Sequence, residues 1–145
     1  MIANQKTMVN TFWECNSKYF NHSLPTPIFK TFNRVDSIAK FECYKNKNNS
    51  KKPIREQIIF MSDCFDYPQK KFIEIMVHEM IHYSIAWNRI KDNNPHGKEF
   101  MKIANELKEK YDLNITKKVD ASSFKLTENA PKIIKKKSLF NFLFG

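Results

Sequence analysis

The sequence predicts an α+β fold in which about three helices pack against a small, mostly antiparallel sheet of about three strands. The chain has 145 residues, of which 41% are hydrophobic, so a single domain with one buried core is expected. Two segments repeat apolar residues at helical spacing, and a third long segment contains neither proline nor glycine. Short apolar or alternating segments follow the first of these and are typical of strands.

The first expected element is a helix over residues 5–22, where Met8, Phe12 and Cys15 recur at steps of three and four. A proline-rich stretch ends this helix, because proline cannot continue it. Strands are predicted next, at residues 28–32, 38–44 and 57–62. The polar, basic Lys45–Arg55 loop separates the second strand from the third.

A second helix is predicted to start within Asp66–Gln69, with Pro68 in its first turn, and to run to about residue 88. Its start is indicated by Asp66, a residue type that caps helices, and by Gln69 three residues later, as in a capping box. A loop over residues 91–95 then leads to a last helix at residues 97–111, whose apolar side chains form one stripe.

We expect one domain over residues 1–116 and a basic, Phe-rich C-terminal tail over residues 117–145. The tail holds seven lysines against Asp120 and Glu128, which gives it half of the net charge of +10. Its aromatic end either stays a tail, docks on the domain or crosses to a neighbouring chain.

The composition excludes several classes of site. With glycine only at positions 97 and 145, neither a Walker A loop nor a dinucleotide-binding fingerprint is present. The charge of +10 favours a polyanion such as nucleic acid or an anionic membrane surface, although it also fits solubility alone. Three cysteines without a CxxC pair and an N-terminus without a signal pattern predict a cytoplasmic protein. No apolar run is long enough for a transmembrane segment.

An HExxH motif, His78-Glu79-Met80-Ile81-His82, lies inside the second predicted helix. Residues four apart share one helical face, so the two imidazoles can bind a single Zn²⁺. Glu79 lies beside the metal without coordinating it and can take a proton from a metal-bound water. Of the two other histidines, His96 opens the last helix and is the predicted third ligand. His22 is interpreted as a surface or capping residue.

Two alternatives stay open for this segment. The motif could consist of core histidines, which would need a polar network around their buried imidazoles. Glu74, one turn before His78, either orients a ligand from outside the coordination sphere or forms a surface ion pair with Lys70 or Lys71.

The segment from about residue 11 to residue 115 resembles the SprT-like zinc metallopeptidases, the family that includes the Spartan DNA–protein crosslink proteases. The resemblance rests on three segments: Ile58–Ser62, Glu74–His82 and Pro95–Phe100. Together they place HEMIH about fourteen positions before HG-x-EF. Many larger members carry a C-terminal zinc ribbon, which this chain lacks because no cysteine follows Cys64.

The resemblance implies a minimal zincin-like fold with HExxH on the central helix. It makes His78, His82 and His96 the ligands of Zn²⁺ and Glu79 the catalytic base, in agreement with the spacing of these residues. The implied activity is peptide-bond hydrolysis, and in the Spartan branch the substrates are proteins on DNA.

The leading hypothesis is therefore a zinc metalloendopeptidase acting on protein substrates, with DNA-associated proteins among the candidates. Tyr83, Arg89 and Tyr111 are candidates, by residue type alone, for stabilising the tetrahedral intermediate. The alternative is a nucleic-acid-binding module with a structural or latent zinc site. Non-specific DNA binding would use the Lys45–Arg55 loop and the basic run Lys132–Lys137. A third hypothesis attaches the basic tail to an anionic membrane.

Overall fold

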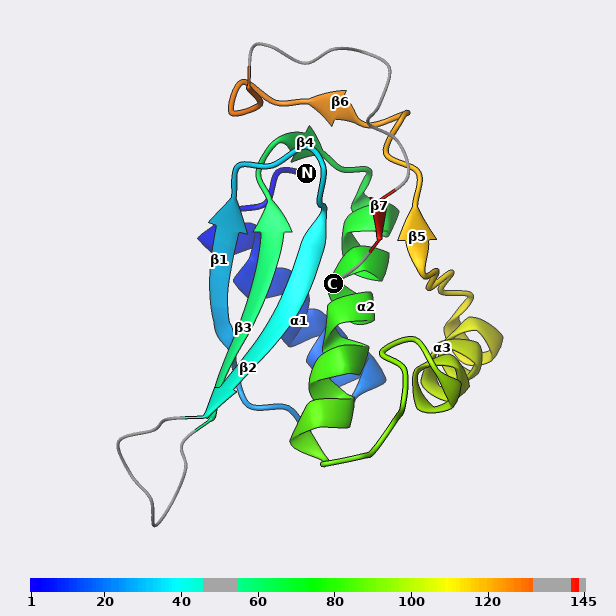
Figure 1. The fold of residues 1–145 in the computed structure, drawn as a ribbon. Coiled ribbons are helices and arrows are strands. Elements are labelled where there is room, and N and C mark those ends of the chain that lie inside the picture. Colours follow the sequence, from blue (N-terminus) through cyan, green and yellow to red (C-terminus); the bar gives the residue numbers. More distant parts are fainter. Residues whose placement is uncertain (46–54, 132–141, 144–145) are drawn as a thin grey trace.

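The computed structural model describes residues 1–45, 55–131 and 142–143 (Figure 1). These residues form the helices α1 (Gln5–Tyr19), α2 (Gln69–Trp87) and α3 (Lys98–Tyr111). The strands are β1 (Ile28–Phe32), β2 (Ala39–Lys45), β3 (Arg55–Ser62), β4 (Phe65–Asp66), β5 (Lys118–Val119), β6 (Lys125–Leu126) and β7 (Phe142–Leu143). The predicted α+β class is confirmed, and each predicted helix and strand lies close to its expected bounds.

The main sheet has the strand order β1-β3-β2. β3 pairs antiparallel with β2, where Phe41 lies opposite Ile59, and parallel with β1, where Phe29 lies opposite the same residue. The sheet is therefore mixed rather than mostly antiparallel. The most apolar strand, which contains Ile58–Met61, takes the central position, where its neighbours pair with both of its edges.

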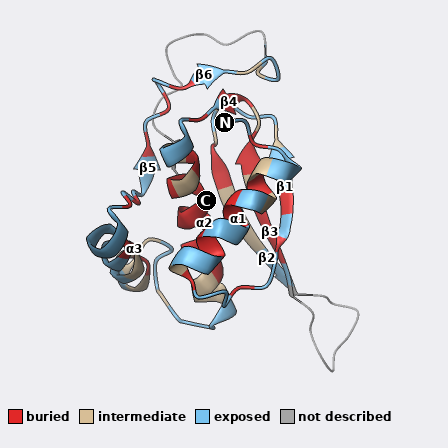
Figure 2. Cartoon of the chain, turned by 180° about the vertical axis from the view of Figure 1, so that it is seen from behind, coloured by how far each residue is buried: buried red, intermediate tan, exposed pale blue. Residues whose placement is uncertain are grey.

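Two helices, α1 and α2, cover one face of this sheet, and α3 packs against α2 on the side away from it (Figure 1). The layer between helices and sheet is aromatic. The ring centroids of Phe12 and Phe29 are 5.5 Å apart, and Tyr83 stacks on Phe41 at 5.3 Å. Figure 2 shows that the buried parts of α1 and α2 face the sheet. This packing fixes the orientation of α2, the helix that carries the HExxH motif.

The start of α2 differs from the prediction. Pro68 is its N-cap and makes no side-chain hydrogen bond, whereas Asp66 belongs to β4 and does not cap the helix. The Asp66 carboxylate instead accepts a hydrogen bond from the α-amino group of Met1, which also donates to the Tyr67 carbonyl at 2.6 Å. The charged amine is a stronger partner for the carboxylate than a backbone N–H group.

The end of α1 also differs, because the helix stops at Tyr19 instead of residue 22. Asn21 and His22 adopt φ angles of 52° and 56°, which a right-handed helix does not allow. Buried Asn16 holds the chain beyond this turn, since its side chain donates to the Leu24 carbonyl at 2.8 Å and accepts from the Leu24 N–H at 3.3 Å. His22 is exposed, as predicted.

Residues 118–126 pack on the domain. β6 pairs antiparallel with β4, and the Phe124 ring lies edge-on to Tyr67 with centroids 5.6 Å apart. Val119, Ala121 and Phe124 are part of the buried core. β7 pairs antiparallel with β5, so the two strands join the start and the end of the predicted tail. The division of the chain after residue 116 stays a prediction.

Candidate metal centre

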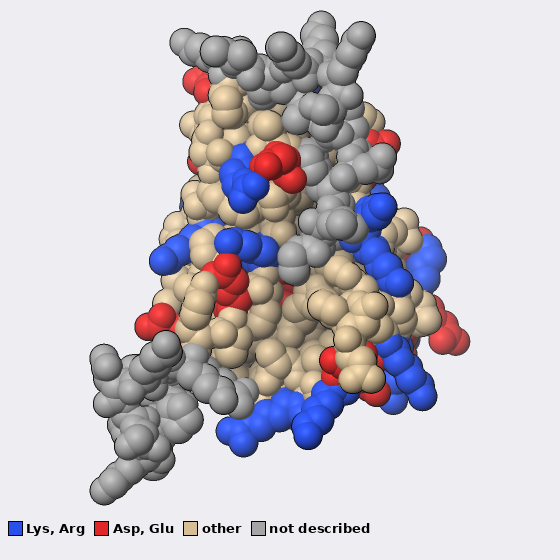
Figure 3. Space-filling view, in the orientation of Figure 1, with Lys and Arg blue, Asp and Glu red and all other residues tan. Residues whose placement is uncertain are grey.

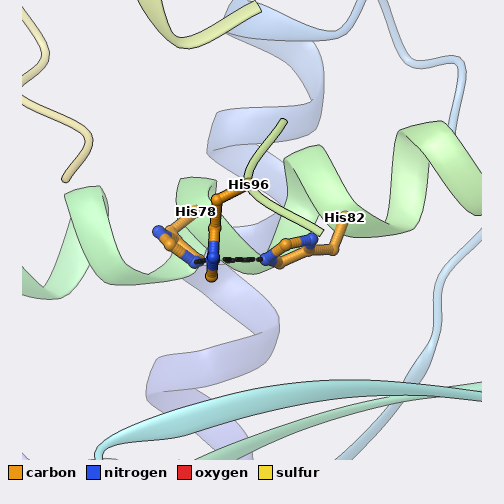
Figure 4. Close-up of side chains that lie close together, drawn as sticks. All are labelled: His78, His82 and His96. Carbon is orange, nitrogen blue, oxygen red and sulfur yellow. Dashed lines mark hydrogen bonds between the residues drawn. The ribbon is translucent and has the colours of Figure 1, made fainter. Parts of the chain in front are cut away.

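Three histidines from two parts of the chain meet beside α2 (Figure 4). His78 and His82 lie one turn apart on α2, and His96 comes from the loop before α3. The Nε2 atom of His78 is 3.1 Å from that of His96 and 3.2 Å from that of His82, and the Nε2 atoms of His82 and His96 are 3.2 Å apart. The three nitrogens converge on one position and could hold a metal ion.

Polar side chains in the loop between α2 and α3 place His96. The Asn94 side chain accepts a hydrogen bond from the His96 backbone N–H at 3.0 Å. Asp92 Oδ2 accepts one from the Glu99 N–H at 3.1 Å, and Asp92 therefore caps α3 from the loop. A Cβ atom at the N-cap residue Gly97 would lie 2.4 Å from Asp92 Oδ1, so only glycine leaves room for this cap.

Phe100, in the first turn of α3, packs against the histidine cluster and is fully buried. Its ring centroid is 4.8 Å from the centroids of His78 and His82 and 5.0 Å from that of His96. An apolar ring in contact with three imidazoles limits their rotation and keeps water off their carbon atoms. The start of α3 thus brings together His96, just before the helix, and the apolar ring of Phe100, in its first turn.

A backbone carbonyl fixes the tautomer of His78. Its Nδ1 atom lies 2.9 Å from the carbonyl oxygen of Thr116. Because a carbonyl oxygen can only accept, Nδ1 carries the proton and donates it. Nε2 is then the nitrogen with the lone pair, which is the atom that converges with the other two histidines.

Burial keeps the three imidazoles neutral. It lowers the pKa of His78 to about 2, with smaller contributions from His82 and His96, and it lowers the pKa of His82 to about 4. The pKa of His96 is also lowered, first by burial and then by the nearby charge of Lys117. Neutral imidazole is the form that binds metal ions, so the cluster suits a cation at neutral pH.

Glu79 is completely buried, with its Oε1 atom 3.9 Å from His78 Nε2. Within the described part of the chain, neither carboxylate oxygen has a hydrogen-bond partner. Burial raises the pKa of Glu79 well above its usual value. A buried carboxylate without a partner is unfavourable for folding, so stability does not explain the position of Glu79 beside three convergent histidines.

Comparison with protein families gives a match over the larger part of the chain. The SprT-like family matches residues 9–119, a range that contains the HExxH motif, His96 and all three helices except the first turn of α1. The chain belongs to the SprT-like family. A search of curated proteins found no match. The resemblance predicted from HEMIH and HG-x-EF is thereby confirmed.

Two of the three residues considered for oxyanion stabilisation in this SprT-like chain, Tyr83 and Tyr111, have other partners. Tyr83 faces the sheet, and its hydroxyl donates to the Pro25 carbonyl at 2.7 Å. Tyr111 packs edge-on against Tyr19, with ring centroids 4.9 Å apart. Arg89 is exposed just after the end of α2, where its φ angle is 55°. Neither tyrosine is therefore directed at the histidine cluster.

Sequence reasoning missed the groups that orient the three histidines. Thr116 acts through its backbone carbonyl, so its residue type carries no signal. Asp92 and Asn94 do carry a weak signal, because side chains of this type bind nearby backbone N–H groups at turns and helix starts. The signal is a helix that begins after glycine, with aspartate or asparagine a few residues before it.

Proposed function

We propose that this SprT-like protein is a zinc-dependent peptidase in which His78, His82 and His96 hold Zn²⁺ and Glu79 is the general base. The observation that carries the proposal is the convergence of three Nε2 atoms at separations of 3.1, 3.2 and 3.2 Å. Two ligand nitrogens about 2.0–2.1 Å from a tetrahedral zinc ion are about 3.3 Å apart. The residues present therefore fit this metal in number, chemistry and spacing.

The number of ligands favours catalysis over a structural zinc site. A structural site closes its coordination with four protein ligands, whereas a catalytic site uses three and leaves one position for water or substrate. The group that the structure brings together contains three histidines and does not include Glu79. His78 is buried, while His82 and His96 are half-buried, so the centre is reached from the side of these two residues.

The position of Glu79 suits proton transfer. Zinc bound here would lower the pKa of a coordinated water toward ~7 and polarise a peptide carbonyl. The Glu79 carboxylate would take one proton from the attacking water and deliver it to the nitrogen of the leaving amine as the peptide bond breaks. Its oxygens have no hydrogen-bond partner among the described residues that would compete for this proton.

The substrate and partners of the peptidase are part of the proposal. Loosely folded or DNA-associated proteins are the candidates implied by the family resemblance. Figure 3 shows basic and acidic side chains interspersed on the face of the main sheet, where opposite charges such as Lys40 and Glu42, 2.7 Å apart, offset each other. The predicted DNA contacts in the Lys45–Arg55 loop and at Lys132–Lys137 fall almost wholly outside the described residues.

None of the helices in the described residues is long and apolar enough to cross a bilayer. Attachment of the basic tail to an anionic membrane stays a prediction, because its basic run Lys132–Lys137 lies outside the described residues. A cytoplasmic location stays part of the proposal.

The test is cleavage of a loosely folded basic protein by the zinc-loaded wild type and by Glu79→Gln, each with and without single-stranded DNA. The expected result is cleavage by the wild type alone, while both proteins bind zinc equally. Stimulation by DNA would extend the proposal to DNA-associated substrates. If both proteins bind zinc and DNA but neither cleaves, the binding-module alternative replaces the peptidase.

A further inference from the structure

Glu74 lies on α2 one turn before His78, and only 4% of its surface is exposed. Its Oε2 atom accepts a hydrogen bond from the backbone N–H of Asn114, and its Oε1 atom is 3.4 Å from Lys71 Nζ. A surface ion pair with Lys70 or Lys71 was one of the two alternatives considered for Glu74, yet the carboxylate is buried and also bonds a distant backbone group. A buried carboxylate needs such partners. Its hydrogen bond from the Asn114 N–H connects Glu74 to the segment after α3.

This segment is tied to α2 at two points. The Asn114 N–H donates to Glu74, and two residues later the Thr116 carbonyl accepts from His78 Nδ1 at 2.9 Å. Glu74 and His78 occupy successive turns of α2, so the two bonds lie side by side. Leu113 and Ile115 are buried and hold the same segment by apolar contacts. The Thr116 carbonyl thus depends on a short stretch of chain whose nearest polar anchor on α2 is Glu74.

We propose that Glu74 is a positioning residue of the metal centre, which holds Asn114 and thereby keeps the Thr116 carbonyl on His78 Nδ1. When the bond to Asn114 is lost, the carbonyl can turn toward water. His78 then exchanges with the tautomer whose Nε2 carries the proton and cannot bind a metal ion. This inference rests on the metal centre of the proposed function but not on peptidase activity.

Two substitutions separate the reach of the Glu74 side chain from its charge. Glu74→Asp keeps the charge but withdraws the carboxylate by one methylene, out of reach of the Asn114 N–H. Glu74→Gln keeps the reach, and its amide oxygen can still accept this hydrogen bond. Lys71→Ala removes the ion pair alone. Glu109→Asp, on the exposed side of α3, is the matched control for shortening a glutamate.

Two measurements on the full chain test whether Glu74 positions the Thr116 carbonyl. Long-range ¹H–¹⁵N NMR of the metal-free protein reports the His78 tautomer, and competition with a chromophoric chelator reports zinc affinity. We expect wild type, Glu74→Gln, Lys71→Ala and Glu109→Asp to share the Nδ1–H tautomer and a similar affinity. Glu74→Asp should show mixed tautomers and bind zinc about ten-fold more weakly or worse.

The inference is overturned if Glu74→Asp keeps both the tautomer and the affinity of the wild type. It is also overturned if Glu74→Gln loses both the tautomer and the affinity, since Glu74 would then act through its charge. If Glu74→Asp does not fold, the inference is overturned as well, since Glu74 would then act only on stability. A wild type with the expected tautomer but no zinc binding would reject the proposed function, and the comparison of tautomers would still decide the role of Glu74.

Discussion

Gly97→Ala is expected to destabilise the protein and to weaken metal binding through His96. The new Cβ atom would lie 2.4 Å from Asp92 Oδ1 and 2.9 Å from the Asn94 carbonyl oxygen. Moving Asp92 away breaks its bond to the Glu99 N–H, and losing such a cap costs about 0.5–2 kcal/mol. Shifting the backbone at Asn94 strains the 2.9 Å bond from the Gly97 N–H to its carbonyl, at about 0.5–1.5 kcal/mol.

Alanine also restricts the unfolded chain, which offsets about 0.4–1 kcal/mol of this loss. We therefore expect Gly97→Ala to lower the free energy of unfolding by a net ~1–2 kcal/mol, or roughly 3–6 °C in Tm. Urea unfolding and a zinc competition titration measure the two effects. Lys98→Ala, at the exposed next position, is the control and should match the wild type.

A double-mutant cycle with Asp92→Ala tests the cause directly. Asp92→Ala removes the cap and also the side chain that the new methyl group meets. The two substitutions together should therefore cost less than the sum of their separate effects, by about 1 kcal/mol. Strict additivity, or a Gly97→Ala protein as stable as the wild type, would refute the reasoning.

Further predictions concern metal, pH and the turn after α1. Zinc at a hundred times its Kd should raise the free energy of unfolding by about 2.7 kcal/mol, or roughly 8 °C in Tm. If zinc raises the Tm of His96→Ala by the same amount, His96 is not a ligand. Metal-free protein should lose stability below about pH 6.5, because unfolded histidines gain protons there while His78 and His82, with pKa values of about 2 and 4, stay neutral when folded. Urea unfolding that is flat between pH 7 and 5 would argue against this. Asn16→Ala should lower the free energy of unfolding by about 1–3 kcal/mol, because it leaves both backbone groups of Leu24 without their partner; an unchanged Tm would show that water replaces it.

The histidine cluster was predictable because its main determinants are local. Residues four apart on a helix share a face whatever the rest of the fold does, so HExxH alone brings His78 and His82 together. His96 could be placed because a short loop restricts where the next helix can begin. The strands were recognised from their short apolar or alternating patterns. The strand predicted at residues 57–62 could also be recognised as mostly apolar.

The parts that could not be predicted depend on long-range competition. Asp66 has the residue type of a helix cap, but the Met1 amine, 65 positions away in the chain, takes its carboxylate. The parallel pairing of β1 with β3 depends on the order of the strands in the sheet. The local pattern of apolar residues within each strand does not encode that order. The support of His78 by Thr116 uses a backbone carbonyl, a group that every residue carries.

The most direct test of the three-histidine centre is a crystal structure of the zinc-loaded protein with anomalous scattering at the zinc edge. We predict one zinc ion bound to the Nε2 atoms of His78, His82 and His96 at about 2.0–2.1 Å, with a non-protein ligand in the fourth position and Glu79 not coordinated. A fourth protein ligand closing the coordination, or zinc bound elsewhere with these histidines bonded only to one another, would contradict an open catalytic centre.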